Sequence, residues 1–379
     1  VSQAYGLPLD PERLVGDLSA GERQRVEIIR CLLQEPKLLI MDEPTSVLTP
    51  QEVTTLFTTL RKLKAEGTSI LYISHKLEEI RALCETATIL RGGKKVATCD
   101  PRKKSARELA EMMVGGTLNS AKAKKTTLGE VVLKVSELSL PPQSAFGTSL
   151  KNITFQLHKG EILGIGGVAG NGQDELLACL SGEVKTTGDA IQLNGVSLGN
   201  MLPNVRRALG VLAAPEERLG HAAAPDMSLT ENAMLTAMTR QNLSKSGFLD
   251  WPRAKAFAEQ VISQFDVRTP GPQSAARSLS GGNLQKFVIG REVLQDPEVL
   301  IVNQPTWGVD AAAAADIRQA LLDLATKGAA VIVISQDLDE LMEISTSFAA
   351  LNTGRLSTAR PMAELSLDEI GLLLGGADA

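Results

Sequence analysis

This chain of 379 residues has only four cysteines, no long apolar run and no excess of positive charge. No stretch of about 18 uninterrupted apolar residues occurs, so no segment predicts a membrane-spanning helix. The four cysteines have neither metal-ligand spacing nor the density of a disulfide framework, which favours a reducing compartment. The formal net charge of −5 argues against broad nucleic-acid binding, which depends on clustered Lys and Arg.

The rest of the composition is that of an ordinary globular protein. Hydrophobic residues make up 43% of the chain and charged residues 22%, which excludes disorder, collagen and coiled coil. At roughly 150 residues per domain, the length predicts two or three domains.

A repeat organises the sequence. Residues 18–45 and 279–306 are identical at 13 of 28 positions at a constant offset of 261, and the same offset aligns 73–79 with 334–340. The chain therefore predicts two copies of one domain. We place the first copy at residues 1–115, a small-residue and lysine-rich linker at 116–129, and the second copy at 130–379.

Both copies predict the same order of helices and strands. The expected helices are about 20–34, 50–66, 281–295 and 311–327, and the expected strands are 37–41, 69–73, 298–302 and 330–334. Continuous apolar strands that alternate with helices indicate a parallel sheet covered on both faces, and so an α/β fold.

A glycine-rich loop lies between an expected strand at 162–165 and a helix expected from Glu175 onward. Gly167 and Gly172 have the G-x-x-x-x-G spacing of a P-loop, in which backbone N–H groups and a helix N-terminus bind phosphate. Gln173 and Asp174 stand where that motif has Lys and Ser or Thr. A glycine-rich turn without a ligand is the alternative interpretation.

Polar residues follow the expected strands of the first copy. Asp42 and Glu43 come after the strand at 37–41, and His75 follows the strand at 69–73. Adjacent carboxylates at a strand end suit magnesium binding and the polarisation of attacking water, and the histidine suits contact with a γ-phosphate. Taken singly, each also fits a solvated strand end or a structural histidine.

Together these motifs resemble the ATP-binding cassette family of P-loop NTPases over nearly the whole chain. LSAGE (18–22) and LSGGN (279–283) resemble its signature motifs, LLIMDE (38–43) its Walker B strand, and SVLTPQE (46–52) its D-loop. The resemblance implies an α/β fold of two tandem copies, the first partial, each a mixed sheet with flanking helices. It also implies ATP and Mg²⁺ as ligands and an ATPase coupled to solute import.

The resemblance narrows further to the cassettes of simple-sugar or nucleoside importers, through ELAEMMVG (108–115), GVAGNGQ (167–173) and PEERLG (215–220). The nucleoside branch is favoured, with ribose-type importers close to it. Such a protein is expected to lie peripherally on the cytoplasmic face of the membrane. Its partners are membrane permease subunits and, through them, a periplasmic or lipid-anchored solute-binding protein, without nucleic acid.

The resemblance also assigns roles to residues. Catalysis falls to Glu43 and His75, and the metal ligand is Asp42. Nucleotide binding falls to Ser19, Gly21, Ser280, Gly281, Gly282, Gly167, Gly170, Asn171, Gly172, Gln173 and Asp174. Cassettes of this family pair head to tail, so each ATP lies between the P-loop of one copy and the signature motif of the other.

The two ATP sites that this pairing implies are unequal. In the one that uses the second P-loop, every charged or catalytic position is altered. Gln173, Asn303, Gln304 and Gln336 are neutral, and Glu216 stands where a glutamine is expected. We expect weak nucleotide binding and no fast hydrolysis there. The P-loop of the other site would lie about 94 residues before Val1, so we expect the sequence to be N-terminally truncated and this fragment to be inactive alone.

Two other functions compete with this one. A soluble tandem cassette acting on ribosomes or DNA would ordinarily carry a long charged linker and two intact sites. A non-catalytic structural protein would have no need of Asp42, Glu43 and His75 together. The sequence does not specify the solute, because no residue here contacts it.

Overall fold

A computed structural model describes residues 10–12, 14–15, 20–42, 44–45, 50–74, 76–91, 93–105, 108–109, 112, 128–143, 147–168 and 170–374. The chain divides into two compact units, residues 1–120 and 121–379. All but the last two residues of the expected linker, 116–129, lie outside the described ranges. Within those ranges, no helix is both long and apolar enough to cross a membrane.

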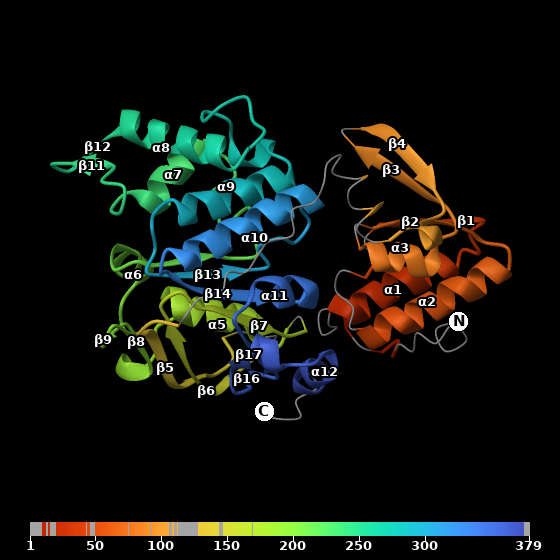
Figure 1. Ribbon diagram of the computed structural model, residues 1–379, viewed down its shortest axis with the longest axis horizontal. Helices are drawn as coiled ribbons and strands as arrows, with labels where there is room; N and C mark the ends of the chain where they lie inside the picture. Colours follow the sequence, from red (N-terminus) through yellow and green to blue (C-terminus); the bar gives the residue numbers. More distant parts are fainter. Residues whose placement is uncertain are drawn as a thin grey trace. The chain divides into compact units, whose positions relative to one another are not determined.

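The second unit is built on a seven-stranded mixed sheet (Figure 1). Its strands are β10 (Val211–Ala214), β13 (Val299–Asn303), β14 (Ala330–Ser335), β7 (Ile162–Gly166) and β15 (Ser347–Asn352), followed by β16 (Arg355–Leu356) and β17 (Arg360–Pro361). The first five run parallel in that order, whereas β16 and β17 pair antiparallel with β15. Every residue of β7, β13 and β14 is buried, as a parallel sheet covered on both faces requires. The predicted α/β class is confirmed.

Helices and a smaller sheet cover the two faces. The helices are α5 (Gln173–Ser181), α6 (Pro203–Ala208), α7 (Leu229–Ala237), α8 (Trp251–Gln264), α9 (Gly281–Val293), α10 (Ala311–Thr326), α11 (Leu338–Ile344) and α12 (Leu367–Leu374). The antiparallel sheet runs β6 (Leu150–His158), β5 (Val131–Leu140), β8 (Ile191–Leu193), β9 (Val196–Ser197). A hairpin pairs β11 (Ser244–Lys245) with β12 (Phe248–Leu249).

Alternate side chains of each central strand enter opposite cores. Leu300 and Val302 of β13 join the core formed with α7, α8, α9 and α10, which contains Phe287. Val299 and Ile301 join the core formed with α5 and the antiparallel sheet. Figure 1 shows these two groups of elements on the two sides of β13 and β14. Because successive strand residues point to opposite faces, each central strand must be apolar throughout.

The described part of the first unit contains two small sheets and three α-helices. The parallel pair is β1 (Leu38–Asp42) with β2 (Ser69–Ile73), and the antiparallel pair is β3 (Ala87–Arg91) with β4 (Lys94–Cys99). The helices are α1 (Ala20–Leu32), α2 (Pro50–Ala65) and α3 (Leu77–Leu83). Leu56 and Leu60 of α2 are completely buried at the centre of its core.

The structural elements repeat at the offset found in the sequence. Adding 261 to the bounds of α1, α2, α3 and β1 gives those of α9, α10, α11 and β13. The bounds predicted for α1, α2, α9, α10 and the strands β1, β2, β13 and β14 differ from the observed ones by at most two residues at either end. The largest difference at a helix start is α5, which begins at Gln173 rather than Glu175 because Gly172 caps it in a left-handed conformation.

One strand of the repeat is missing from the described part of the first unit. In the second unit β7 lies between β14 and β15, whereas β2 pairs only with β1 there and β3 only with β4. The first unit also exposes an apolar strip: Leu38, Ile40, Leu71 and Ile73 are 45% to 59% exposed. Their counterparts Val299, Ile301, Ile332 and Ile334 are at most 1% exposed, because α5 and the antiparallel sheet cover them.

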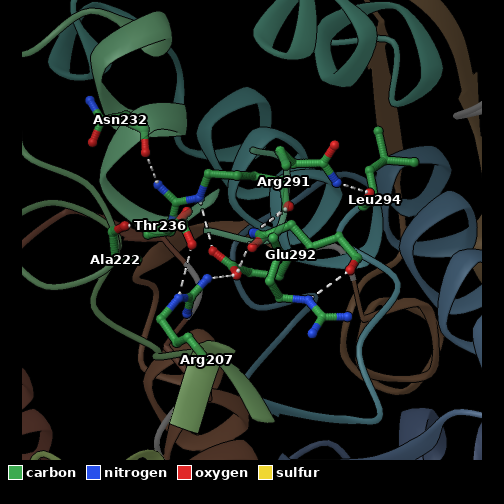
Figure 2. Close-up of polar contacts among 10 residues, drawn as sticks. Arg207, Ala222, Asn232, Thr236, Arg291, Glu292 and Leu294 are labelled. Atoms are coloured by element: carbon green, nitrogen blue, oxygen red, sulfur yellow. Dashed lines mark hydrogen bonds and ion pairs between the residues drawn. The ribbon is translucent and has the colours of Figure 1, made fainter. Parts of the chain in front are cut away.

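A buried network of charged side chains joins α9 to α6 and α7 (Figure 2). Glu292 is fully buried and pairs with Nε of Arg291 at 2.9 Å and with Nη2 of Arg207. Arg291 also donates to the carbonyl oxygens of Ala222 (2.8 Å) and Asn232 (3.1 Å). Burial by itself would raise the pKa of Glu292, but the charges of the two arginines outweigh it and the pKa is lowered.

We predict that Glu292→Ala destabilises the chain by about 3–5 kcal/mol, because it leaves a fully buried arginine charge without its partner. Urea denaturation followed by circular dichroism measures the free energy of unfolding. The control is Glu259→Ala, which breaks a pair with Lys255 whose side chains are both 53% exposed, and should cost no more than about 1 kcal/mol. Equal losses in the two variants would contradict the role given to the network.

Candidate nucleotide-binding site

The glycine loop between β7 and α5 has the backbone form of a phosphate-binding loop. Gly170 (φ 83°) and Gly172 (φ 111°) adopt left-handed conformations. A Cβ on Gly167 would lie 2.6 Å from the carbonyl oxygen of Leu351, so a side chain does not fit there. The loop leads into the N-terminus of a nine-residue helix, where free N–H groups and the helix dipole favour an anion.

Gln173 turns its side chain back into this loop. Its Oε1 accepts a hydrogen bond from the N–H of Asn171 (3.0 Å), and its Nε2 donates to the carbonyl oxygen of Val168 (2.8 Å). Asn171 ties the loop to the turn after β15, since its Oδ1 accepts from the N–H of Thr353 (2.9 Å). The amide therefore holds the loop in shape but presents no positive charge to a phosphate.

Asp174, in the first turn of α5, meets the end of β13. Nδ2 of Asn303 donates to Oδ1 of Asp174 at 3.0 Å. Asn303 is 1% exposed, and its own Oδ1 is buried without a hydrogen-bond partner. Burial, and after it the neighbouring carboxylate of Glu175, raises the pKa of Asp174. A carboxylate and an amide thus face each other across the loop.

Gln304 and Gln336 follow β13 and β14 and lie beside each other. Gln304 has a left-handed backbone (φ 51°), and its N–H donates to the carbonyl oxygen of Ile334 (2.8 Å). Its Oε1 accepts from the N–H of Gln336 at 3.4 Å. Neither side chain takes up a proton near neutral pH, so neither position supplies a general base.

Glu340 is buried next to these two glutamines and was missed by sequence reasoning. Its Oε2 accepts a hydrogen bond from the hydroxyl of Ser335 (2.8 Å), and burial raises its pKa to about 7. The first unit has the corresponding contact, because the hydroxyl of Ser74, the counterpart of Ser335, donates to Oε2 of Glu79 at 3.5 Å. The signal was present in the sequence, since Glu79 and Glu340 align at the offset of 261.

A pocket of about 730 Å³ opens beside Asp174. The loop after β10 supplies Glu216 and Arg218, and Trp307 lines the pocket as well. The guanidinium of Arg218 lies 5.4 Å from the centroid of the Trp307 ring, within range of a cation–π contact. Burial, and after it the charge of Asp174, raises the pKa of Glu216, so carboxylates gather where the resemblance expects a neutral glutamine.

The second signature motif forms the start of α9. Ser280 is the residue before the helix, and Gly281 and Gly282 are its first two residues. Ser280 is exposed, and its hydroxyl oxygen accepts from Nδ2 of Asn283 (2.8 Å). A Cβ on Gly281 would lie 2.6 Å from Nη1 of Arg218, so this glycine permits a close approach. The motif presents an open helix N-terminus.

The structure describes only Gly21 and Asp42 among the site residues predicted in the first copy. Asp42 is the last residue of β1 and is exposed, and Gly21 is the second residue of α1. Ser19, Glu43 and His75 lie outside the described residues. The structure thus brings together the second copy's loop, Asn303, Gln304 and Gln336. The roles assigned to the first copy remain predictions.

The site offers oxygen donors that could hold a magnesium ion. The described residues contain no group of three or more His, Cys, Asp or Glu side chains arranged to hold a metal ion. Asp174 and the unpartnered Oδ1 of Asn303 do offer two oxygen ligands. Mg²⁺ takes one or two protein carboxylates and completes its shell with water and phosphate oxygens, so these donors fit it.

Comparison with known proteins identifies the family. The family model described as "ABC transporter" matches residues 1–46 and 150–307. The chain is 36% identical over its full length to the nucleoside import ATP-binding protein of Lactococcus lactis subsp. cremoris, and covers 75% of it. The chain belongs to the ABC transporter family. This cassette protein is also 37% identical over its full length to the glucose import ATP-binding protein of Haloferax volcanii, covering 70% of it. To the galactose/methyl galactoside import ATP-binding protein of Escherichia coli it is 38% identical, over 93% of the chain and 69% of that protein.

Solved structures agree on the fold. The ATP-binding subunit of an ABC transporter matches 64% of this chain and 99% of its own, with a TM-score of 0.53 and 23% identity. A cassette solved as a post-hydrolysis dimer with ADP and phosphate matches 61% and 98%, with a TM-score of 0.51 and 19% identity. The cassette fold, which binds ATP and ADP, is therefore that of this ABC protein.

We predict that Glu340→Gln reduces the pH dependence of stability. The folded chain holds the Glu340 proton more tightly than the unfolded chain, so stability present below about pH 4.5 is lost as the pH rises through about 7. The free energy of unfolding should fall between pH 5 and pH 8 by on the order of 3 kcal/mol more in the unchanged chain than in the variant. Urea titrations at both pH values measure this, with the exposed Glu364→Gln as control. Identical pH profiles in all three proteins would refute the assignment.

Proposed function

We propose that this chain is the energy-coupling ATPase subunit of an importer for simple sugars or nucleosides. The observation that carries the proposal is 36% to 38% identity, over 93% to 100% of the chain, to import ATP-binding proteins named for nucleosides, glucose and galactose. These identities differ by two percentage points, so they do not choose between sugar and nucleoside. A soluble tandem cassette acting on ribosomes or DNA has no support among these relatives.

The proposed partners follow from the same relatives. An ATP-binding protein of an importer works with membrane permease subunits, and through them with a solute-binding protein on the other side. The chain would then bind peripherally to the cytoplasmic face of the membrane. Its solute would be selected by those partners, since the cassette's own chemistry is directed at ATP.

The two copies would have different tasks. We assign hydrolysis to the first copy, with Asp42 as the Mg²⁺ ligand, Glu43 polarising the attacking water and His75 contacting the γ-phosphate. The domain boundaries proposed for this division are 1–115 and 130–379. In the second copy the glycine loop, with Gly167, Gly170, Asn171, Gly172, Gln173 and Asp174, would bind nucleotide without hydrolysing it. Ser19, Gly21, Ser280, Gly281 and Gly282 would contribute signature-motif contacts.

The loss of charge supports this division. A charge-assisted hydrogen bond from a P-loop lysine is worth roughly 1.5–3 kcal/mol, or about 10- to 150-fold in affinity. The side chain of Gln173 instead accepts from the N–H of Asn171 and donates to the carbonyl oxygen of Val168. Gln304 and Gln336 bring no charge to the ends of β13 and β14.

We predict that the natural protein containing this chain copurifies with a multi-helix permease encoded beside it, and that solute and binding protein together stimulate its ATP hydrolysis in proteoliposomes. Stimulation should be lost when either the binding protein or the solute is omitted, because transport couples the two sides. The measurement is phosphate release with sugars and nucleosides tested in parallel. Association with ribosomes in place of membranes would overturn the proposed function.

We further predict unequal effects of two substitutions in that complex. Glu43→Gln should lower the ATPase rate by about 100-fold or more, because one aligned acid positions and polarises the attacking water. Gln304→Glu should change it by less than about 2-fold, since residues that act as a unit are not restored singly. Phosphate release and uptake by each variant provide the comparison. Equal losses, or a large gain from Gln304→Glu, would place the hydrolytic site in the other copy.

A further inference from the structure

Compared with a P-loop, the second copy has its carboxylate and its uncharged polar side chain at exchanged positions. A P-loop carries a hydroxyl at the second position of its helix, and the strand opposite ends in a carboxylate. Here the helix carries the carboxylate of Asp174, and the strand ends in the amide of Asn303. The two side chains are in contact, with Nδ2 of Asn303 donating to Oδ1 of Asp174 at 3.0 Å. One carboxylate is thus retained, on the opposite element.

The oxygen of Asn303 is the second observation that points to a ligand. Asn303 is 1% exposed, and its Oδ1 is buried without a hydrogen-bond partner. A buried amide oxygen without a partner is costly, and native structures usually satisfy such an atom with water or an ion. Amide oxygens are also ligands for hard cations. The contact with Asp174 orients the amide, since the reverse orientation would set two oxygens against each other.

The surrounding charges favour a cation over a free anion. The carboxylates of Glu175 and Glu217 act on Asp174 electrostatically, and Glu216 is affected by Asp174 in turn. His221 and Arg218 oppose them in part. The side chain of Gln173 offers no positive charge to the loop. A nucleotide phosphate that enters this loop would meet the carboxylate of Asp174 unless a cation lies between them.

We propose that the second copy binds nucleotide only as its divalent-cation complex, with Asp174 on the P-loop helix as the carboxylate ligand and Asn303 as an amide ligand. This proposal rests on the proposed function, because the nucleotide is its phosphate source. The protein supplies two ligands, and water and phosphate oxygens supply the others. Cation alone should therefore bind weakly.

The experiment titrates the full chain with a fluorescent ATP analogue in Mg²⁺ and in EDTA, and with Mn²⁺ by electron paramagnetic resonance with and without the analogue. Nucleotide should bind at least about 10-fold more tightly with Mg²⁺ than in EDTA, and the analogue should tighten Mn²⁺ binding by a similar factor. Asp174→Ser should reduce both ratios to about 2-fold or less. The double variant Asp174→Ser with Asn303→Asp returns the carboxylate to the strand and should restore them. Asp189→Ser, at an exposed acidic residue, should leave both unchanged.

The outcomes separate this inference from the function on which it rests. Nucleotide binding that is equally strong in EDTA and Mg²⁺, or unaffected by Asp174→Ser, overturns the cation ligand and leaves the nucleotide site intact. No binding by any variant under any condition overturns nucleotide binding by the second copy as well, while uptake by the complex would still test the importer. The double variant could also fail to restore the two ratios although its circular dichroism spectrum is unchanged. A carboxylate on the strand would then be unable to replace Asp174, and the proposed exchange of ligand positions would be wrong.

Discussion

Parallel pairing of fully buried strands is the constraint that brings the candidate site together. β7, β13 and β14 run in the same direction, so their carboxyl ends meet at one edge of one sheet. The glycine loop follows β7, Asn303 is the last residue of β13, and Gln336 follows β14, although the three are far apart in the sequence. Since both faces of the strands are buried, polar chemistry is confined to that edge.

At that edge, neutral amides stand where the family resemblance expects charged groups. An amide both donates and accepts, so Gln173 satisfies an N–H and a carbonyl of its own loop. Gln304 likewise accepts from the N–H of Gln336. These hydrogen bonds shape the loops, and the amides that make them carry no charge. The second copy thus has the cassette fold with uncharged side chains at these three positions.

The two units differ in what covers their corresponding strands. In the second unit, α5 and the antiparallel sheet cover one face of β13 and β14, and α7, α8, α9 and α10 cover the other. In the described part of the first unit, Leu38, Ile40, Leu71 and Ile73 are exposed, whereas their counterparts in the second unit are buried. The same strand pattern therefore has different surroundings in the two units.

The sequence by itself determined the repeat, the α/β class, the glycine loop and, to within two residues, the positions of the helices and strands that it predicted, because these depend on local periodicity and on short motifs. It did not determine the turn of Gln173 into its loop, the contact between Asp174 and Asn303, or the burial of Glu292 between two arginines. Asp174 and Asn303 are 129 residues apart, and Arg207 and Glu292 are 85 apart. Which polar side chain meets which is decided only when packed strands and helices bring them together, since the free energy of each contact depends on burial that no local pattern encodes.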